Sequence, residues 1–394
     1  MKIFKPTLQT NDAVSRVECA IEYRGKKHLL WIEFDSKYKP FVALDATAVT
    51  SPFIMPASRR NEDVEILDRV SQKWLKGVNA IVDRAVSWNH GFKKIAVHSL
   101  HTNQDQEPKF NHVGAFFSGG IDSFSTLIKY TNDKNTPLSH LFFVHGYDIE
   151  VGNDKLIEEV RLRMREIAQK SDLELVEFKT NVREITDTLL GWEMAHGGAL
   201  AMVALLLRRG FKTVIIPGGG ANNWPEPWGS SQHLDPLWGT ETLEIIHDMD
   251  HMHRYDKVRE HIAKSPLALA HARVCWRNTA YNCGRCDKCM LTMVELRIAG
   301  ALEQCSTFPE KLNLERLSKM YSTPFSVRMQ VEEAAEHLQK TGNDPELLAA
   351  LESSLEYSDH PGIIKKTISI AQQLDWKYNE SRLFVFLHKR WRWS

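Results

Sequence analysis

The sequence predicts an α/β fold with a doubly wound, mostly parallel sheet at the centre of the chain. From about residue 112, short apolar segments alternate with segments of helical periodicity, as in β-α-β units. The preceding segments alternate apolar and polar residues as strands do, and the segments after residue 310 have helical spacing. We therefore expect an N-terminal β-rich domain at 1–108, a sheet domain at 109–310 and a helical C-terminal extension at 311–394.

Individual elements follow from the same patterns. The N-terminal domain is expected to contain strands at 17–23 and 28–34, joined by a hairpin turn, then a helix over 64–81 and a polar linker at 101–108. The sheet domain is expected to contain strands at 113–117, 140–144, 173–178 and 213–217, and helices at about 123–131, 153–170 and 193–209. The clearest helices of the extension are expected at 327–340 and 345–357.

Composition narrows the classes of protein. The 394 residues include 50 Lys+Arg and 50 Asp+Glu, and this balance argues against nucleic acid as a partner, because phosphate contacts need clusters of basic residues. No apolar run approaches the roughly 20 residues of a membrane span, and the N-terminus lacks the apolar core of a signal peptide. We expect a cytoplasmic protein with no membrane partner, and the sequence leaves its oligomeric state open.

The most informative segment joins an expected strand to an expected helix and reads Ser118-Gly119-Gly120-Ile121-Asp122-Ser123. Glycines let the backbone curl and expose amide donors, and the start of a helix adds the positive end of its dipole. The hydroxyls of Ser118 and Ser123 can add donors, and Asp122 can cap the helix or help hold a Mg²⁺ brought by a nucleotide. These features predict an anion site; the alternative is an ordinary strand-to-helix turn. A Walker loop is excluded because its Lys and glycine spacing are missing.

Four of the six cysteines fall within fifteen positions: Cys275, Cys283, Cys286 and Cys289. Thiolates at this spacing can complete a tetrahedral zinc site, which would hold the loop in shape and leave no open position for water. An iron–sulfur cluster is an alternative, because cysteine ligation alone does not select the metal, and free buried cysteines are another. The other two, Cys19 and Cys305, are expected to be buried as small apolar residues.

The glycine-containing loop resembles that of the PP-loop, or N-type ATP pyrophosphatase, superfamily, which has the adenine nucleotide alpha hydrolase-like fold. Within this group, the added cysteine pattern resembles the 7-cyano-7-deazaguanine synthases (QueC), over about residues 112–310. The resemblance implies an ATP-dependent carbon–nitrogen ligase. In the family reaction, ATP adenylates 7-carboxy-7-deazaguanine with release of pyrophosphate. Ammonia then displaces AMP to form an amide, and a second ATP dehydrates that amide to a nitrile.

The resemblance also implies roles for single residues. The phosphate loop corresponds to Ser118, Gly119, Gly120, Asp122 and Ser123. Gly146 and Asp148 lie where the family has a segment near the nucleotide, and Gly218 begins a loop like the second glycine-containing loop of the superfamily. Lys257 lies where the family has a lysine that can contact phosphates; a surface lysine is the alternative.

The segments that would face the substrate depart from the family pattern. The expected substrate residues are His196, Asn222, Trp224 and Asp235. The alternative for His196 is a core histidine whose hydrogen bonds are satisfied within the fold. The alternative for Trp224 is that its side chain packs to anchor the loop. In these departures and in its terminal extensions, the chain resembles the QueC-like proteins of bacterial antiviral islands more than a minimal synthase. The implied partners are therefore a small-molecule carboxylate and either ammonia or an amine of a partner protein.

Two other functions remain open, namely tRNA modification through adenylation of a base and a nucleotide-binding scaffold without turnover. The run His247–His253 contains enough ligand types for a second metal ion, with His247 and His251 on one face of a helix. We favour a solvated or pocket-edge helix there, because the cysteines already supply a complete site.

Overall fold

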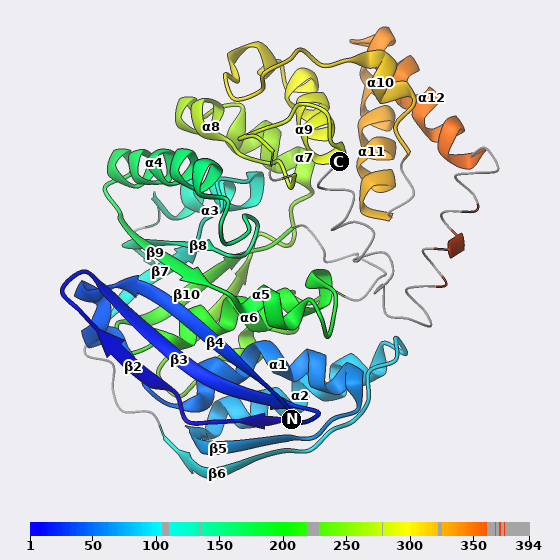
Figure 1. Ribbon diagram of the computed structural model, residues 1–394. Helices are drawn as coiled ribbons and strands as arrows, with labels where there is room; N and C mark the ends of the chain where they lie inside the picture. The colour runs from blue at the N-terminus through cyan, green and yellow to red at the C-terminus, as the bar shows by residue number, and fades with distance from the viewer. Residues whose placement is uncertain are drawn as a thin grey trace. The chain divides into compact units, whose positions relative to one another are not determined.

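Two compact units make up the chain, Met1–His253 and Arg254–Ser394. The computed structural model describes residues 1–104, 110–131, 133, 135–219, 228–277, 279–321, 325–360, 367, 370, 371 and 374 (Figure 1). The first unit is of the α/β class and contains a mixed sheet, with eleven strands among these residues. The described elements of the second unit are helical. No helix in the described ranges has both the length and the apolar character that a membrane span requires.

Five parallel strands form the half of the sheet that carries the expected phosphate loop. β7 (His112–Phe116) pairs with β8 (His140–His145) on one side and with β10 (Phe211–Pro217) on the other. β9 (Glu174–Thr180) continues the sheet beyond β8, and β11 (Glu244–Asp248) continues it beyond β10. The strand order reverses at β7, so the connections after β7 and β10 leave in opposite directions.

The four predicted strands of this region are confirmed, and so are its three helices. These are α3 (Ile121–Thr131), α4 (Asp154–Lys170) and α6 (Trp192–Leu206), with a short α5 (Val182–Thr186) before α6. Figure 1 shows α3 and α4 on one face of the sheet and α5 and α6 on the other. Every residue of β8 is buried, as expected for a parallel strand that is covered on both faces.

The N-terminal strands extend the same sheet. They are β1 (Lys2–Ile3), β2 (Thr7–Thr10), β3 (Val14–Tyr23), β4 (Lys26–Asp35), β5 (Val64–Ser71) and β6 (Val97–Asn103). The predicted hairpin is confirmed as β3 and β4. β4 pairs antiparallel with β9, where Ile32 lies opposite Thr180. The boundary expected at residue 108 therefore falls inside the first unit, because main-chain hydrogen bonds join the two expected domains.

The helix predicted over 64–81 is wrong in its first half, which forms β5. Val64 and Ile66 are buried as alternate residues, and parallel pairing with β1 and β6 outweighs their approximate helical spacing. Ser71 then caps α2 (Gln72–Ser87) by accepting a hydrogen bond from the Trp74 amide at 3.1 Å. The start of the expected linker at 101–103 is likewise strand, the end of β6.

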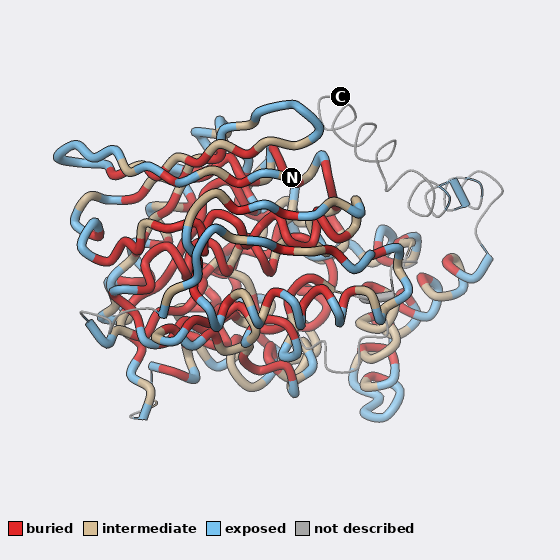
Figure 2. The backbone as a smooth tube through the Cα atoms, turned by 90° about the horizontal axis from the view of Figure 1, so that it is seen from below, coloured by how far each residue is buried: buried red, intermediate tan, exposed pale blue. Residues whose placement is uncertain are grey.

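The helix α1 (Ala46–Arg60) is present without a sequence prediction, since Pro52 and Pro56 interrupt its helical signal. A short 3-10 helix, η1 (Ser36–Phe41), precedes it. Tertiary packing stabilises α1, because it lies against α6 and 13 of its residues, Ala46 to Ser58, are buried. In Figure 2, buried residues run through the interior elements and exposed ones gather at turns.

The second unit contains α7 (Arg254–Lys257), a π-helical turn η3 (Val258–Ile262), α8 (Pro266–His271), α9 (Asp287–Ile298), η4 (Leu302–Gln304), α10 (Leu314–Ser318), α11 (Phe325–Thr341) and α12 (Pro345–Asp359). The helices predicted at 327–340 and 345–357 are confirmed. Val294 of α9 shares one apolar core with Leu317, Val331 and Leu351 of the later helices. The expected division at residue 310 therefore falls within a common core.

Gly198 of α6 is expected to be essential to the packing of α1 on α6. A Cβ atom there would lie 2.4 Å from the Ser51 carbonyl oxygen, so Gly198→Ala should lower the free energy of unfolding by about 1–3 kcal/mol despite its better helix propensity. Urea denaturation measures the change. Gly219→Ala, in the loop after β10, would meet no heavy atom within 4 Å and should change stability by less than about 0.5 kcal/mol. Equal effects of the two substitutions would contradict this account.

Candidate functional site

The segment 117–120 turns the chain from β7 into α3. The Phe117 amide donates to the Phe142 carbonyl at 2.9 Å, which keeps the start of the turn beside β8. Gly119 has φ +78°, a left-handed conformation that favours glycine. The Gly120 amide donates to Ser118 Oγ at 3.3 Å, and Ser123 Oγ donates to the Gly120 carbonyl at 3.0 Å. Asp122 lies in the first turn of α3, whose amides have no carbonyl partners within the helix.

Three of the predicted site segments meet at one edge of the sheet. The phosphate loop follows β7, Gly146 and Asp148 follow β8, and Gly218 follows β10. Because these strands are parallel, their carboxyl ends share an edge. Ligands of open α/β sheets bind outside this edge, at the point where the strand order reverses, which here lies between β7 and β10.

Asp248, at the end of β11, connects this edge to α3. Its buried carboxylate accepts hydrogen bonds from Thr126 Oγ1 at 3.0 Å and from the Tyr130 hydroxyl at 3.4 Å, and it also contacts Lys129. Its main-chain carbonyl accepts from the Gly218 amide at 2.8 Å. Burial lowers the pKa of Lys129, but the hydrogen bond and charge of Asp248 outweigh it and raise that pKa overall. The sequence prediction missed Asp248, since its partners lie about 120 positions away.

Gly146 and Asp148 differ in their surroundings. Gly146 has φ +108°, and a Cβ atom there would lie 2.0 Å from the Thr180 carbonyl oxygen, so this glycine lets the ends of β8 and β9 approach each other. Asp148 is exposed at the rim. Between them, Tyr147 is buried and its hydroxyl donates to the Ala199 carbonyl of α6. The glycine therefore has a packing role, and its contact with a nucleotide stays a prediction.

The predicted substrate residues His196 and Asp235 lie in one polar cluster with His247. Asp235 begins η2 (Asp235–Trp238) and is fully buried. Its Oδ2 accepts from Ser230 Oγ at 2.6 Å and lies 2.7 Å from His247 Nδ1, whereas its Oδ1 has no hydrogen-bond partner. The charge of Asp235 also acts on the half-buried His196. Asn222 and Trp224 lie outside the described residues.

His196 and His247 differ in protonation. Burial lowers the pKa of His196, whose Nδ1 lies 3.1 Å from the Trp192 carbonyl and whose ring lies 5.5 Å from that of Trp228. Burial would also lower the pKa of His247, but Asp235 and Asp250 outweigh it and raise that pKa to about 9. His247 Nε2 lies 3.2 Å from Asp250 Oδ1. At neutral pH the first ring is therefore neutral and the second is a cation.

The expected helix over His247–His253 is wrong. His247 lies on β11 and His251 in the following turn, because pairing with β10 extends the chain there. The two rings do not share a helix face. Among the described residues, the group of side chains with metal-ligand geometry is the cysteine cluster.

The four clustered cysteines converge in the second unit. Their Sγ atoms all lie within 4.8 Å of one another, with Cys275 and Cys286 4.0 Å apart and Cys283 and Cys289 3.9 Å apart. Zinc–sulfur bonds of about 2.3 Å place tetrahedral ligands about 3.8 Å apart, so the group can hold a single ion such as zinc. Hydrogen bonds from the other two buried thiols lower the pKa of Cys275, which favours its thiolate.

The loop around these cysteines is held by its neighbours. Asn282 Oδ1 accepts from the Val274 and Cys275 amides at 2.9 and 3.2 Å, and Gly284 has φ +68° between two ligands. The sequence prediction missed Asn282, whose role depends on the folded loop. Cys19 and Cys305 lie outside the cluster and are buried as predicted, with burial raising the pKa of Cys19 to about 12.

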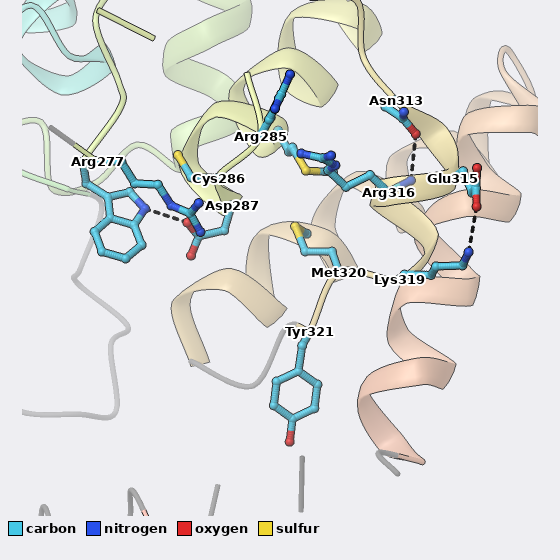
Figure 3. Close-up of a pocket in the computed structure, with 12 residues that line it drawn as sticks. Arg277, Arg285, Cys286, Asp287, Asn313, Glu315, Arg316, Lys319, Met320 and Tyr321 are labelled. Carbon is cyan, nitrogen blue, oxygen red and sulfur yellow. Dashed lines mark hydrogen bonds and ion pairs between the residues drawn. The ribbon is translucent and has the colours of Figure 1, made fainter. Parts of the chain in front are cut away.

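A cavity of about 550 Å³ borders the cysteine site (Figure 3). Its lining includes Cys286 and Asp287 from one side and Arg316, Lys319 and Tyr321 from the other. Arg316 extends from α10 into the cavity, and Lys319 pairs with Glu315 at 2.7 Å. The lining contains more basic than acidic side chains, and the acidic ones include Asp287 and Glu315. The predicted phosphate-loop residues do not line this cavity.

Lys257 is buried, whereas the alternative to a phosphate-binding role was a lysine on the surface. It ends α7 in the second unit and is fully buried. A lysine is rarely buried without a charged or polar partner, so this position is compatible with a specific role. Its contact with phosphate stays a prediction.

Comparisons with family models, with curated proteins and with solved structures found no match. The resemblance to the PP-loop superfamily therefore stays a prediction from the two motifs, and the geometry of the chain carries the functional argument.

Replacing one cluster cysteine is expected to release the metal ion. Cys289→Ser should lower bound zinc from about one ion per chain to almost none and destabilise the second unit, because zinc binding couples to folding. Metal analysis by mass spectrometry and thermal unfolding measure both effects. Cys305→Ser, a buried cysteine of the same unit outside the cluster, should leave the zinc content unchanged. Wild-type protein without zinc or another bound metal would contradict the assignment.

The two carboxylates beside His247 are expected to control its titration. The pKa of this histidine should be about 9 in the wild type and lower in Asp235→Asn, as measured by NMR on protein with labelled histidine. Asp148→Asn, an exposed position, is the control. Because the pKa is raised in the folded state, the ionised ring stabilises the fold fully below about pH 6.5, and that contribution is lost as pH rises through 9. An unchanged titration in Asp235→Asn would exclude this pairing.

Proposed function

We propose that the chain is an ATP-dependent carbon–nitrogen ligase that adenylates a carboxylate, releases pyrophosphate and AMP, and joins the acyl group to an amine. The observation that carries the proposal is the position of the loop Ser118–Ser123. It contains a left-handed glycine, opens α3 and follows the strand at which the sheet order reverses. A phosphate group fits such an edge because helix-end amides are oriented towards it.

The loop would act through electrostatic stabilisation. Main-chain amides and the hydroxyls of Ser118 and Ser123 are donors for the pyrophosphate, where negative charge grows as the bond to the α-phosphate breaks. Mg²⁺ bound with ATP would neutralise part of this charge, and Asp122 in the first turn offers it a carboxylate. Since Asp248 fixes α3 to the end of β11, the donors are ordered before the substrate binds.

The polar cluster would face the carboxylate substrate and the amine. Trp228 and Trp192 lie against His196 and offer flat surfaces for a heterocycle such as a 7-deazaguanine. His196 is neutral at pH 7, so it can accept the proton that the attacking amine loses. The acyl substrate is a 7-carboxy-7-deazaguanine-like acid, and the acceptor is ammonia or an amine of a partner protein, in a role such as antiviral defence.

The proposal predicts that turnover depends on the loop. With ATP, Mg²⁺, 7-carboxy-7-deazaguanine and ammonium, the wild type should release pyrophosphate and AMP, and Ser118→Ala and Asp122→Ala should each lower kcat about 100-fold or more. Ser125→Ala is the matched control, because this hydroxyl on the same helix is buried without a hydrogen-bond partner. Its activity should stay near that of the wild type.

The same assay separates the other functions. Tight ATP binding without pyrophosphate release, with or without an amine, would contradict ligase activity and favour a scaffold. Salt-dependent binding of tRNA would favour base modification. A mass increase of a co-expressed partner protein that disappears with Ser118→Ala would identify a protein amine as the acceptor.

A further inference from the structure

A buried polar cluster contacts both flanks of one predicted loop. Its members are Asp235 at the start of η2, His247 on β11 and Asp250 just after β11. The loop begins at Gly218 after β10 and ends before Ser230, and is here named the second glycine loop. The side chains of the cluster are at most 6% exposed, so they act on the flanks from inside the fold.

The first flank packs directly on His247. A Cβ atom on Gly218 would lie 2.5 Å from His247 Nε2 and 2.6 Å from the Asp248 carbonyl oxygen, so only glycine lets the main chain approach this closely. The Gly218 amide also donates to that carbonyl at 2.8 Å. The position of the imidazole ring therefore limits where the chain can leave β10.

The second flank is attached to Asp235. Ser230 Oγ donates to Asp235 Oδ2 at 2.6 Å, which is a charge-assisted hydrogen bond inside the fold. The amide of the preceding Gly229 donates to the Glu193 carbonyl at 2.8 Å, at the start of α6. This flank therefore has one attachment through a side chain and one through the main chain.

His247 joins the attachments of the two flanks through ion pairs. Its Nδ1 lies 2.7 Å from Asp235 Oδ2, the same oxygen that accepts from Ser230, and its Nε2 lies 3.2 Å from Asp250 Oδ1. Two buried carboxylates without a cation between them would be costly. The ring must therefore stay protonated for the cluster to keep this arrangement.

The other neighbours of His247 do not supply this balance. On β10 it lies opposite Ile216, which is apolar. The carboxylate of Asp248, the next residue on β11, is directed to α3 instead, because successive side chains of a strand point to opposite faces. Asp235 and Asp250 are thus the charges that keep the ring protonated.

We propose that His247 is a positioning residue for the carboxylate substrate, because its ion pairs with Asp235 and Asp250 hold both flanks of the second glycine loop at the carboxyl edge of the sheet. This role rests on the proposed ligase activity. The second flank carries Trp228, whose ring lies 5.5 Å from that of His196, so its position sets the affinity for an acid with a flat ring. ATP is bound at the phosphate loop in that activity, so its affinity should depend little on this cluster.

Substitutions at Ser230 and Asp235 test the role without removing the ring. Ser230→Ala removes the hydrogen bond of the second flank, and Asp235→Asn removes a charge. Each should weaken binding of 7-carboxy-7-deazaguanine to the full-length, zinc-loaded protein about 10-fold, as measured by isothermal titration calorimetry. Affinity for ATP with Mg²⁺ should change less than about twofold. Ser231→Ala is the matched control, because this adjacent hydroxyl forms no hydrogen bond with the described residues, and it should bind like the wild type.

The pH dependence of binding identifies the ion pairs. Binding of the acid to the wild type should weaken as pH rises through about 9, where His247 loses its proton. In Asp235→Asn the pKa of His247 is lower, so binding should weaken at a lower pH. The titration of the acid itself is the same with both proteins and cannot produce this difference. A loss of affinity in Asp235→Asn with an unchanged midpoint would show a merely structural role and overturn the proposal.

Hydrogen exchange tests the flanks in the absence of substrate. The amides of Gly218 and Gly229, both hydrogen-bonded in the fold, should exchange about 10-fold faster in Asp235→Asn than in the wild type. If Asp235→Asn does not fold, Ser230→Ala provides the same comparison of exchange and affinity.

The outcomes separate this role from the ligase. Wild-type affinity for the acid in both variants would overturn the positioning role, whether or not exchange changes, and would leave the ligase standing. A wild type that neither binds the acid nor releases pyrophosphate would overturn the ligase and, with it, the role of His247 in substrate binding.

Discussion

The buried carboxylate of Asp248 holds together the edge of the sheet on which the functional argument depends. Its side chain accepts hydrogen bonds from α3, the helix that the phosphate loop opens, while its carbonyl accepts from Gly218 after the neighbouring strand. A carboxylate that is only 4% exposed is stable when its acceptor positions are filled. Two loops far apart in the chain are thereby fixed relative to each other through the side chain and the carbonyl of one residue.

Two buried arginines differ in whether an acidic side chain pairs with them. Arg208 is only 2% exposed and pairs with Asp45, which also caps α1, so its charge is balanced within the fold. Arg273 is nearly as buried and has no such partner. Folded proteins rarely keep an unpaired buried cation unless it meets another molecule. The contrast separates an arginine with an ion-pair partner in the fold from one that has none among the described residues.

The two units reach order by different means. The first unit has a large apolar core formed by the sheet and its helices, so no metal ion is needed to explain its stability. In the second unit, the described residues of 272–286 form no helix or strand before α9 begins. There the convergence of four thiols and the hydrogen bonds of Asn282 replace a core, as expected for a loop organised around an ion.

The features that can be predicted from the sequence are those whose signal is local. The apolar strands and the helices of the parallel half, the loop with its two glycines and the spacing of the four cysteines all depend on residues close together in the chain. The segment 64–71 was misjudged because its apolar residues suit a helix or a strand, and parallel pairing with β1 and β6 decides between them. Three features emerge only from the folded chain: the expected N-terminal and sheet domains share one sheet, His247 lies between two carboxylates, and Arg273 is buried without a carboxylate partner among the described residues. These depend on contacts between distant residues, and the spacing of residues along the chain carries no information about which distant partner, if any, a buried charge will meet.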